Sequence, residues 1–182
     1  MDHTGAAIAA LTSALQSPEG APFNPQDAIH GLALAHQAVV NAPLIRSYLA
    51  HTDPALRAEA VAALGGDPES RSAILQLLAD PVQPLEVRLA ALHAVGSDDS
   101  ATIAVALDVA TGSAEPLALR AEAIATVGLA ARSAKTRLPA ATLQAISQRL
   151  SGLSAMDAGR LGPVVSRTVF DATRKLNATS EK

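Results

Sequence analysis

The sequence contains no cysteine, only 2% aromatic residues and only three lysines, and each shortage excludes a class of protein or site. Without cysteine there are no disulfides and no thiolate metal sites. Strands are usually rich in β-branched and aromatic residues, so the shortage of aromatics argues against a sheet protein. With three lysines and a net charge of -3, the chain offers no dense positive field that would gather nucleic-acid phosphates.

A long apolar run and a basic leader are missing as well. No run of about 18 uninterrupted apolar residues occurs, so the sequence predicts no membrane span. The start, "MDHTGAAIAALTSALQS", has an aspartate and no lysine or arginine ahead of its apolar run, unlike a secretory signal peptide. We therefore expect a cytoplasmic protein, or a periplasmic one if a leader has been removed.

The chain is rich in small apolar residues. Hydrophobic residues make up 49% of the sequence, and about a fifth of all residues are alanine. Small side chains suit closely packed helices, so the composition predicts an all-α protein.

One eleven-residue pattern occurs three times, as "LRAEAVAALGG", "VRLAALHAVGS" and "LRAEAIATVGL". Apolar residues occupy positions i, i+4, i+5 and i+8 of each copy, which form one stripe of an α-helix. The stripe predicts a packing face, and the glycine that follows predicts the end of the helix. The shared apolar positions are Leu56, Ala60, Val61 and Leu64, then Val87, Ala91, Leu92 and Val95, then Leu119, Ala123, Ile124 and Val127; the glycines are Gly65, Gly96 and Gly128.

A shorter apolar segment precedes each repeat helix and predicts a partner helix. These segments are "APLIRSYLAH", "ESRSAILQLLA" and "SATIAVALDVA". A proline just before each repeat helix (Pro54, Pro84 and Pro116) fits a first helical turn, where its missing N–H bonds nothing. Asp53 and Asp80 lie in the turns between partner and repeat helices, where a carboxylate can cap free N–H groups or reach an arginine.

The helix pairs, with their 31- to 32-residue period and "D-P-x-x-V/L-R-x-x-A" second helix, resemble the HEAT-repeat family, closest to its short bacterial, phycobilisome-lyase-like form. The resemblance implies a right-handed α-α superhelix of about five antiparallel pairs, with the second helices lining its concave side. We expect one domain, residues 1–182, with pairs at approximately 4–40, 42–65, 69–96, 99–130 and 139–177.

The arginine column of the repeat, Arg57, Arg88 and Arg120, has two interpretations. The resemblance to HEAT repeats implies a structural ladder, in which each arginine pairs with a turn aspartate, Arg57 with Asp53 and Arg88 with Asp80. Alternatively, the three guanidinium groups contact an acidic peptide directly.

Two further sets of residues are candidates for partner binding. Glu59, His93 and Glu122 occupy nearly equivalent positions on the variable face of successive repeat helices. They are either solvated groups, with His93 paired to Glu59 or Glu122, or a weak metal or acid–base row. The long connection at 128–142 collects three basic residues and is either a solvated loop or a contact loop; the residues are Arg132, Lys135 and Arg137.

The sequence therefore predicts a non-catalytic scaffold that presents its concave face or an edge to a protein or peptide. No G-x-S-x-G turn or phosphate-binding glycine loop occurs in it, so we expect no enzyme activity, catalytic residue, cofactor or metal site. Two alternatives are a bilin-lyase-like subunit acting on a chromophore carrier protein, which the HEAT resemblance implies, and a HEAT-like nucleic-acid-binding module. The acidic net charge argues against nucleic acid as the partner.

Overall fold

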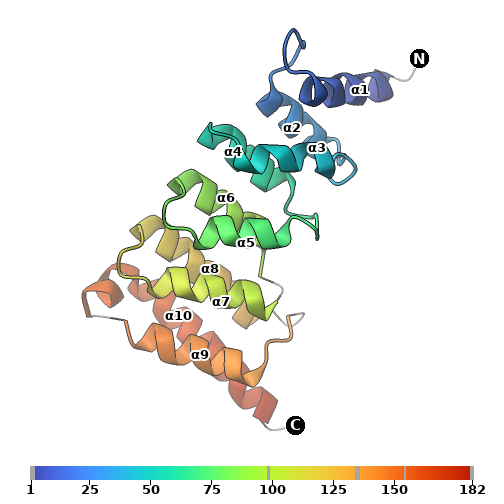
Figure 1. Cartoon of the computed structure of the whole chain (residues 1–182). Coiled ribbons are helices and arrows are strands. Elements are labelled where there is room, and N and C mark those ends of the chain that lie inside the picture. The colour runs from blue at the N-terminus through green and yellow to red at the C-terminus, as the bar shows by residue number, and fades with distance from the viewer. Residues whose placement is uncertain (1–2, 98, 134–135, 154, 181–182) are drawn as a thin grey trace. The chain divides into compact units, whose positions relative to one another are not determined.

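The computed structural model describes residues 3–97, 99–133, 136–153 and 155–180. These residues form ten α-helices and one 3₁₀ helix, and no strand occurs among them (Figure 1). The helices are α1 (His3–Gln16), α2 (Pro25–Leu34), α3 (Ala42–Arg46), η1 (Ser47–Ala50), α4 (Pro54–Ala63), α5 (Arg71–Ala79), α6 (Leu85–Val95), α7 (Ser100–Thr111), α8 (Leu117–Arg132), α9 (Ala140–Ser151) and α10 (Ala155–Ser180). The all-α prediction is confirmed for this part of the chain.

The chain divides into two compact units, Met1–Val95 and Gly96–Lys182. In the first unit the second helices α2, α4 and α6 pack in succession, and each is covered by the helix or helices before it in the chain: α1, then α3 with η1, then α5. In the second unit α7 packs on α8 and α9 on α10, while α8 also contacts α10 and α7 contacts α9. Within each unit, first helices and second helices therefore form two layers.

The apolar stripe of the repeat is buried throughout, as predicted. Its twelve residues on α4, α6 and α8, with Leu64 directly after α4, are at most 6% exposed. A helix of 10 to 16 residues cannot bury such a stripe alone, so neighbouring helices supply the missing cover. The repeat thus correctly identified the core positions of α4, α6 and α8.

The observed helix ends confirm some of the predicted ends and not others. Asp53 caps α4 by accepting a hydrogen bond from the Ala55 N–H at 2.9 Å, and Pro54 begins that helix. Gly96 follows α6 with φ +66°, a conformation that favours glycine. Gly128 was predicted to end its helix and does not: α8 continues to Arg132, and Gly128 is buried within it. The outer helix pairs also differ from the predicted ranges 4–40 and 139–177, because α2 already ends at Leu34 and α10 extends to Ser180.

Candidate functional site

Two arginines of the predicted ladder are structural. Arg88 is 2% exposed and donates from Nε to the Leu78 carbonyl at 2.9 Å, and Arg120 is 3% exposed and donates from Nε to the Ala110 carbonyl at 3.1 Å. In both cases the acceptor lies ten residues earlier, in the last turn of the preceding helix. Each arginine thus satisfies a helix C-terminal carbonyl that has no partner within its own helix. Burial removes both guanidinium groups from direct contact with a peptide.

The acidic residues near the three ladder arginines differ from one copy of the repeat to the next. Arg120 bonds from Nη1 to Asp157 of α10 at 2.8 Å. Hydrogen bonds from Gln83 and the Val82 N–H, and the charge of Arg88, lower the pKa of Asp80. In the first copy, Asp53 acts as a helix cap, and no ion pair joins it to Arg57 in the described part of the chain. The Nε of Arg57 is buried and has no hydrogen-bond partner among the residues that the structure describes.

The row Glu59, His93 and Glu122 is divided between the two units. Glu59 of α4 pairs with His30 of α2, with 2.9 Å between Oε1 and Nδ1. His93 of α6 lines a hollow of about 480 Å³ whose lining includes three alanines. Glu122 is exposed on α8, in the second unit. Among the described residues, no group of three or more His, Asp or Glu side chains could hold a metal ion.

Arg132 lines a second hollow, of about 400 Å³, between α8 and α10. Its Nη1 lies 3.4 Å from Asp171 Oδ2, and Arg167 of α10 borders the same hollow. Ala125, Pro163 and Val164 provide the apolar part of the lining. The hollow therefore combines a small apolar lining with two guanidinium groups.

The connection after α8 is fixed to α10. Lys175 Nζ donates to the carbonyls of Ala130, Ser133 and Thr136 at 3.1, 2.7 and 2.7 Å. Burial lowers the pKa of Lys175. The start of this connection is therefore anchored. Arg137, which belongs to the same connection, is exposed, and Lys135 lies outside the described residues.

A third hollow, of about 540 Å³, was not predicted from the sequence. It lies on the first helices of the first unit, and its lining includes Leu49, Ala50, Ala73, Leu77 and Asp80. Two of the lining residues, Ala50 of η1 and Ala73 of α5, have small side chains that fill little of this space. "YLAH" and "SAILQLL" could have indicated it only if the two helices were known to face each other.

One end of this hollow holds a charged cluster around Arg46. Arg46 pairs with Asp67 at 2.9 Å and with Glu69 at 2.6 Å, and its Nε also donates to Ser70. The hydrogen bond from the Ser70 hydroxyl, together with Arg46, lowers the pKa of Asp67 against the opposing effect of burial. This cluster connects the end of α3 to the turn before α5, so its polar groups are engaged within the protein.

Comparison of the chain with known family models, curated proteins and solved structures found no match. None of the described helices is both long enough and apolar enough to cross a membrane.

Proposed function

We propose that this protein is a non-catalytic interaction module that offers the surface of its second helices to a protein partner. The observation on which the proposal rests is the hollow between α8 and α10, where Arg132 and Arg167 border an apolar lining. An apolar centre with a polar, charged rim is the usual composition of a protein-recognition surface, and arginine is enriched in such surfaces.

The corresponding surface of the first unit supports the proposal. The hollow on α6 is lined by Ala62, Ala90 and Ala94, with Glu86 and His93 at its border. Alanine leaves room for a partner side chain, whereas a larger residue would fill the space. Most of the buried charged groups described above bond to backbone or to each other, which is the pattern of a scaffold rather than of a reactive site.

We also propose that the helix pairs continue as the right-handed superhelix that the HEAT-like repeat implies. The support is the recurrence of one buried stripe at intervals of 31 and 32 residues. A superhelix gives a radius of gyration above the roughly 16 Å expected for a compact domain of this length. Small-angle X-ray scattering measures this radius, and a value near that of a compact domain would contradict the superhelix.

The interaction proposal is tested by filling the hollows. Ala125→Arg places a long side chain in the α8–α10 hollow, and Ala90→Arg does the same on α6. Ala104→Arg is the matched control, because Ala104 is an exposed alanine of the first helix α7. Arginine is nearly as favourable as alanine in a helix, so all three variants should fold normally.

The measurement is quantitative affinity capture from cells of the source organism with the wild-type chain and the three variants as bait. We expect a specific partner that the wild type and Ala104→Arg retain and that Ala125→Arg or Ala90→Arg loses. No partner above background, or equal loss with Ala104→Arg, would contradict the proposal.

A further inference from the structure

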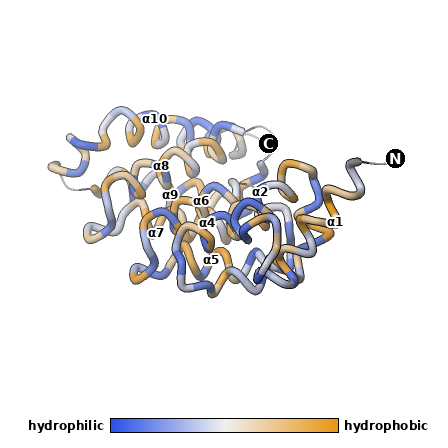
Figure 2. Tube along the Cα trace, turned by 90° about the horizontal axis from the view of Figure 1, so that it is seen from above, coloured by the Kyte–Doolittle hydropathy of each residue, from blue (hydrophilic) through white to orange (hydrophobic). Residues whose placement is uncertain are grey.

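The last helix has a seven-residue repeat of its own. From Gly159 onward the sequence can be written GRLGPVV, SRTVFDA and TRKLNAT, three consecutive heptads within α10. Each heptad begins with a small residue followed by arginine, which gives Arg160, Arg167 and Arg174. Figure 2 shows the resulting alternation of hydrophilic and hydrophobic residues along α10.

One face of this repeat is buried within the second unit. Leu161, Val165, Thr168 and Ala172, spaced by four, three and four residues, are at most 7% exposed. This spacing is that of a coiled-coil seam. The face packs against α8 and α9.

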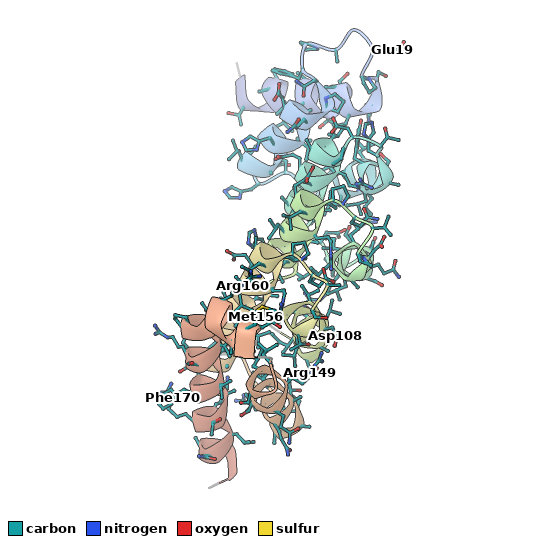
Figure 3. The ribbon with its side chains drawn as sticks, turned by 90° about the vertical axis from the view of Figure 1, so that its left-hand side faces the viewer. Glu19, Asp108, Arg149, Met156, Arg160 and Phe170 are labelled. Atoms are coloured by element: carbon teal, nitrogen blue, oxygen red, sulfur yellow. The ribbon has the colours of Figure 1, made fainter. Side chains whose placement is uncertain are left out.

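The exposed side of α10 contains three parallel rows, and it borders the α8–α10 hollow at Pro163 and Arg167. Met156 and Phe170 are 70% and 65% exposed and, with Pro163 between them, form an apolar row. The other two rows consist of small residues (Gly159, Ser166 and Thr173) and of arginines (Arg160, Arg167 and Arg174). Phe170 projects from α10 on the side turned away from Arg149 of α9 (Figure 3).

Two of these arginines have no partner among the described residues. The side chains of Arg160 and Arg167 make no ion pair or hydrogen bond within the described part of the chain. Arg174 lies 4.0 Å from Asp171 and is 67% exposed. In contrast, Arg149 on α9 pairs with Asp108 at 2.6 Å (Figure 3). The arginine row of α10 therefore has its positive charge available to an external group.

We propose that the outer face of α10 binds an acidic amphipathic helix of the partner protein. This inference rests on the proposed function and names the partner's chemistry. Seven residues of helix advance about 10.5 Å, so a second helix with carboxylates at its own seven-residue spacing matches the arginine row. The row of Gly159, Ser166 and Thr173 lets the helix approach closely, while Met156 and Phe170 receive its apolar side chains.

Three other occupants fit this face less well. A membrane-bound helix has a continuous apolar face with its basic residues on the polar side, whereas here arginines and small residues share the exposed face with the apolar row. A nucleic acid would meet a single row of three arginines on a protein of net charge -3. Two copies joined through this face would bring arginine rows together.

The probe for this inference is a synthetic 21-residue fluorescein-labelled helix. It has glutamate at one heptad position, leucine at two neighbouring positions, and alanine and glutamine elsewhere. One control peptide has the same composition with its glutamates in a single block, and another has lysine in place of glutamate. Binding to the full-length chain is followed by fluorescence anisotropy at low and physiological salt.

The protein variants separate the arginine row from overall charge. Arg160→Glu with Arg167→Glu reverses two charges of the row, whereas Arg137→Glu reverses one exposed charge in the connection before α9. Phe170→Ala shortens the apolar row. All four residues are exposed, so circular dichroism and thermal unfolding should show unchanged folding.

We expect the heptad peptide to bind about tenfold tighter than the block peptide, and the double reversal to weaken it by at least about tenfold. The double variant should instead prefer the lysine peptide, a reversal that a structural role of these arginines would not produce. Phe170→Ala should weaken binding by about fivefold and Arg137→Glu by less than about twofold.

Several results would overturn the inference. One is equal affinity for the heptad and block peptides, and another is an equal effect of the double reversal and of Arg137→Glu on peptide affinity. A third is tighter binding to duplex DNA or to phosphatidylserine vesicles than to the heptad peptide. A fourth is self-association in sedimentation that the double reversal abolishes. If the peptide fails while Ala125→Arg still releases the captured partner, the α10 inference is wrong and the proposed function stands. If the capture experiment fails as well, both are wrong.

Discussion

Gly128→Ala is expected to destabilise the protein, although the same substitution within a helix usually stabilises it. A Cβ at position 128 would lie 2.6 Å from Thr168 Oγ1 and 3.2 Å from Arg132 Nη1. Arg132 can move because its side chain is 35% exposed, but Thr168 is fully buried on the facing helix α10. Replacing glycine by alanine in a helix gains about 1 kcal/mol, and overpacking a buried site costs about 1–3 kcal/mol. The net expectation is a loss of about 1 kcal/mol in the free energy of unfolding.

The measurement is urea unfolding followed by far-UV circular dichroism, with Gly159→Ala as the matched control. Nothing lies within 4 Å of a Cβ at Gly159, so alanine there should stabilise the protein by about 0.5–1 kcal/mol. In a Thr168→Ala background the obstructing Oγ1 is gone, and Gly128→Ala should become stabilising. If Gly128→Ala stabilises the unmodified chain as much as Gly159→Ala does, the close approach of α8 and α10 is refuted.

Four more substitutions test polar groups of the fold. Arg120→Met should lower the free energy of unfolding by about 3 kcal/mol, because it removes the buried hydrogen bonds from Arg120 to the Ala110 carbonyl and to Asp157. Arg57→Met should change it by less than about 0.5 kcal/mol, and urea unfolding of both variants checks this. The folded-state pKa of Asp67 is below its ordinary value of 3.8. The stabilisation that ionised Asp67 contributes is therefore fully present above pH 3.8 and is lost as the pH falls through the folded-state pKa. Asp67→Asn should consequently make the free energy of unfolding less dependent on pH in the acid range. Asp53→Ala removes the cap of α4 and should cost about 1 kcal/mol in thermal unfolding.

The core could be predicted from the sequence because helical periodicity is a local property. Positions i, i+4, i+5 and i+8 share one face whatever surrounds the helix, and all of them are buried in the three repeat helices. Gly128 shows the limit of the same argument. A glycine aligned with two helix ends predicts a third end, but its actual environment depends on Thr168, forty residues later in the chain. A periodic pattern contains no information about which helix approaches that closely.

The candidate site could be predicted less well, because partner choice among charged side chains depends on distances between elements. Glu59 lies on the variable face as expected, yet its partner is His30 of the preceding pair rather than His93. Arg132 lines a hollow only because Pro163, Val164 and Arg167 of α10 complete it. The hollow beside Arg46 likewise depends on residues of η1 and α5, including Ala50 and Ala73, that line the same space. None of these juxtapositions follows from spacing within one helix.

The arginines of the second unit show how similar residues serve opposite purposes. Arg120 belongs to the repeat, where a packed neighbouring helix surrounds it and a C-terminal carbonyl binds it, so its charge is used inside the fold. Arg160 and Arg167 lie on the last helix, whose outer face no described helix covers, so the same chemistry remains available to another molecule. Met156 and Phe170 are exposed on the same helix. Large apolar side chains exposed beside these arginines are the composition on which the proposed binding face rests.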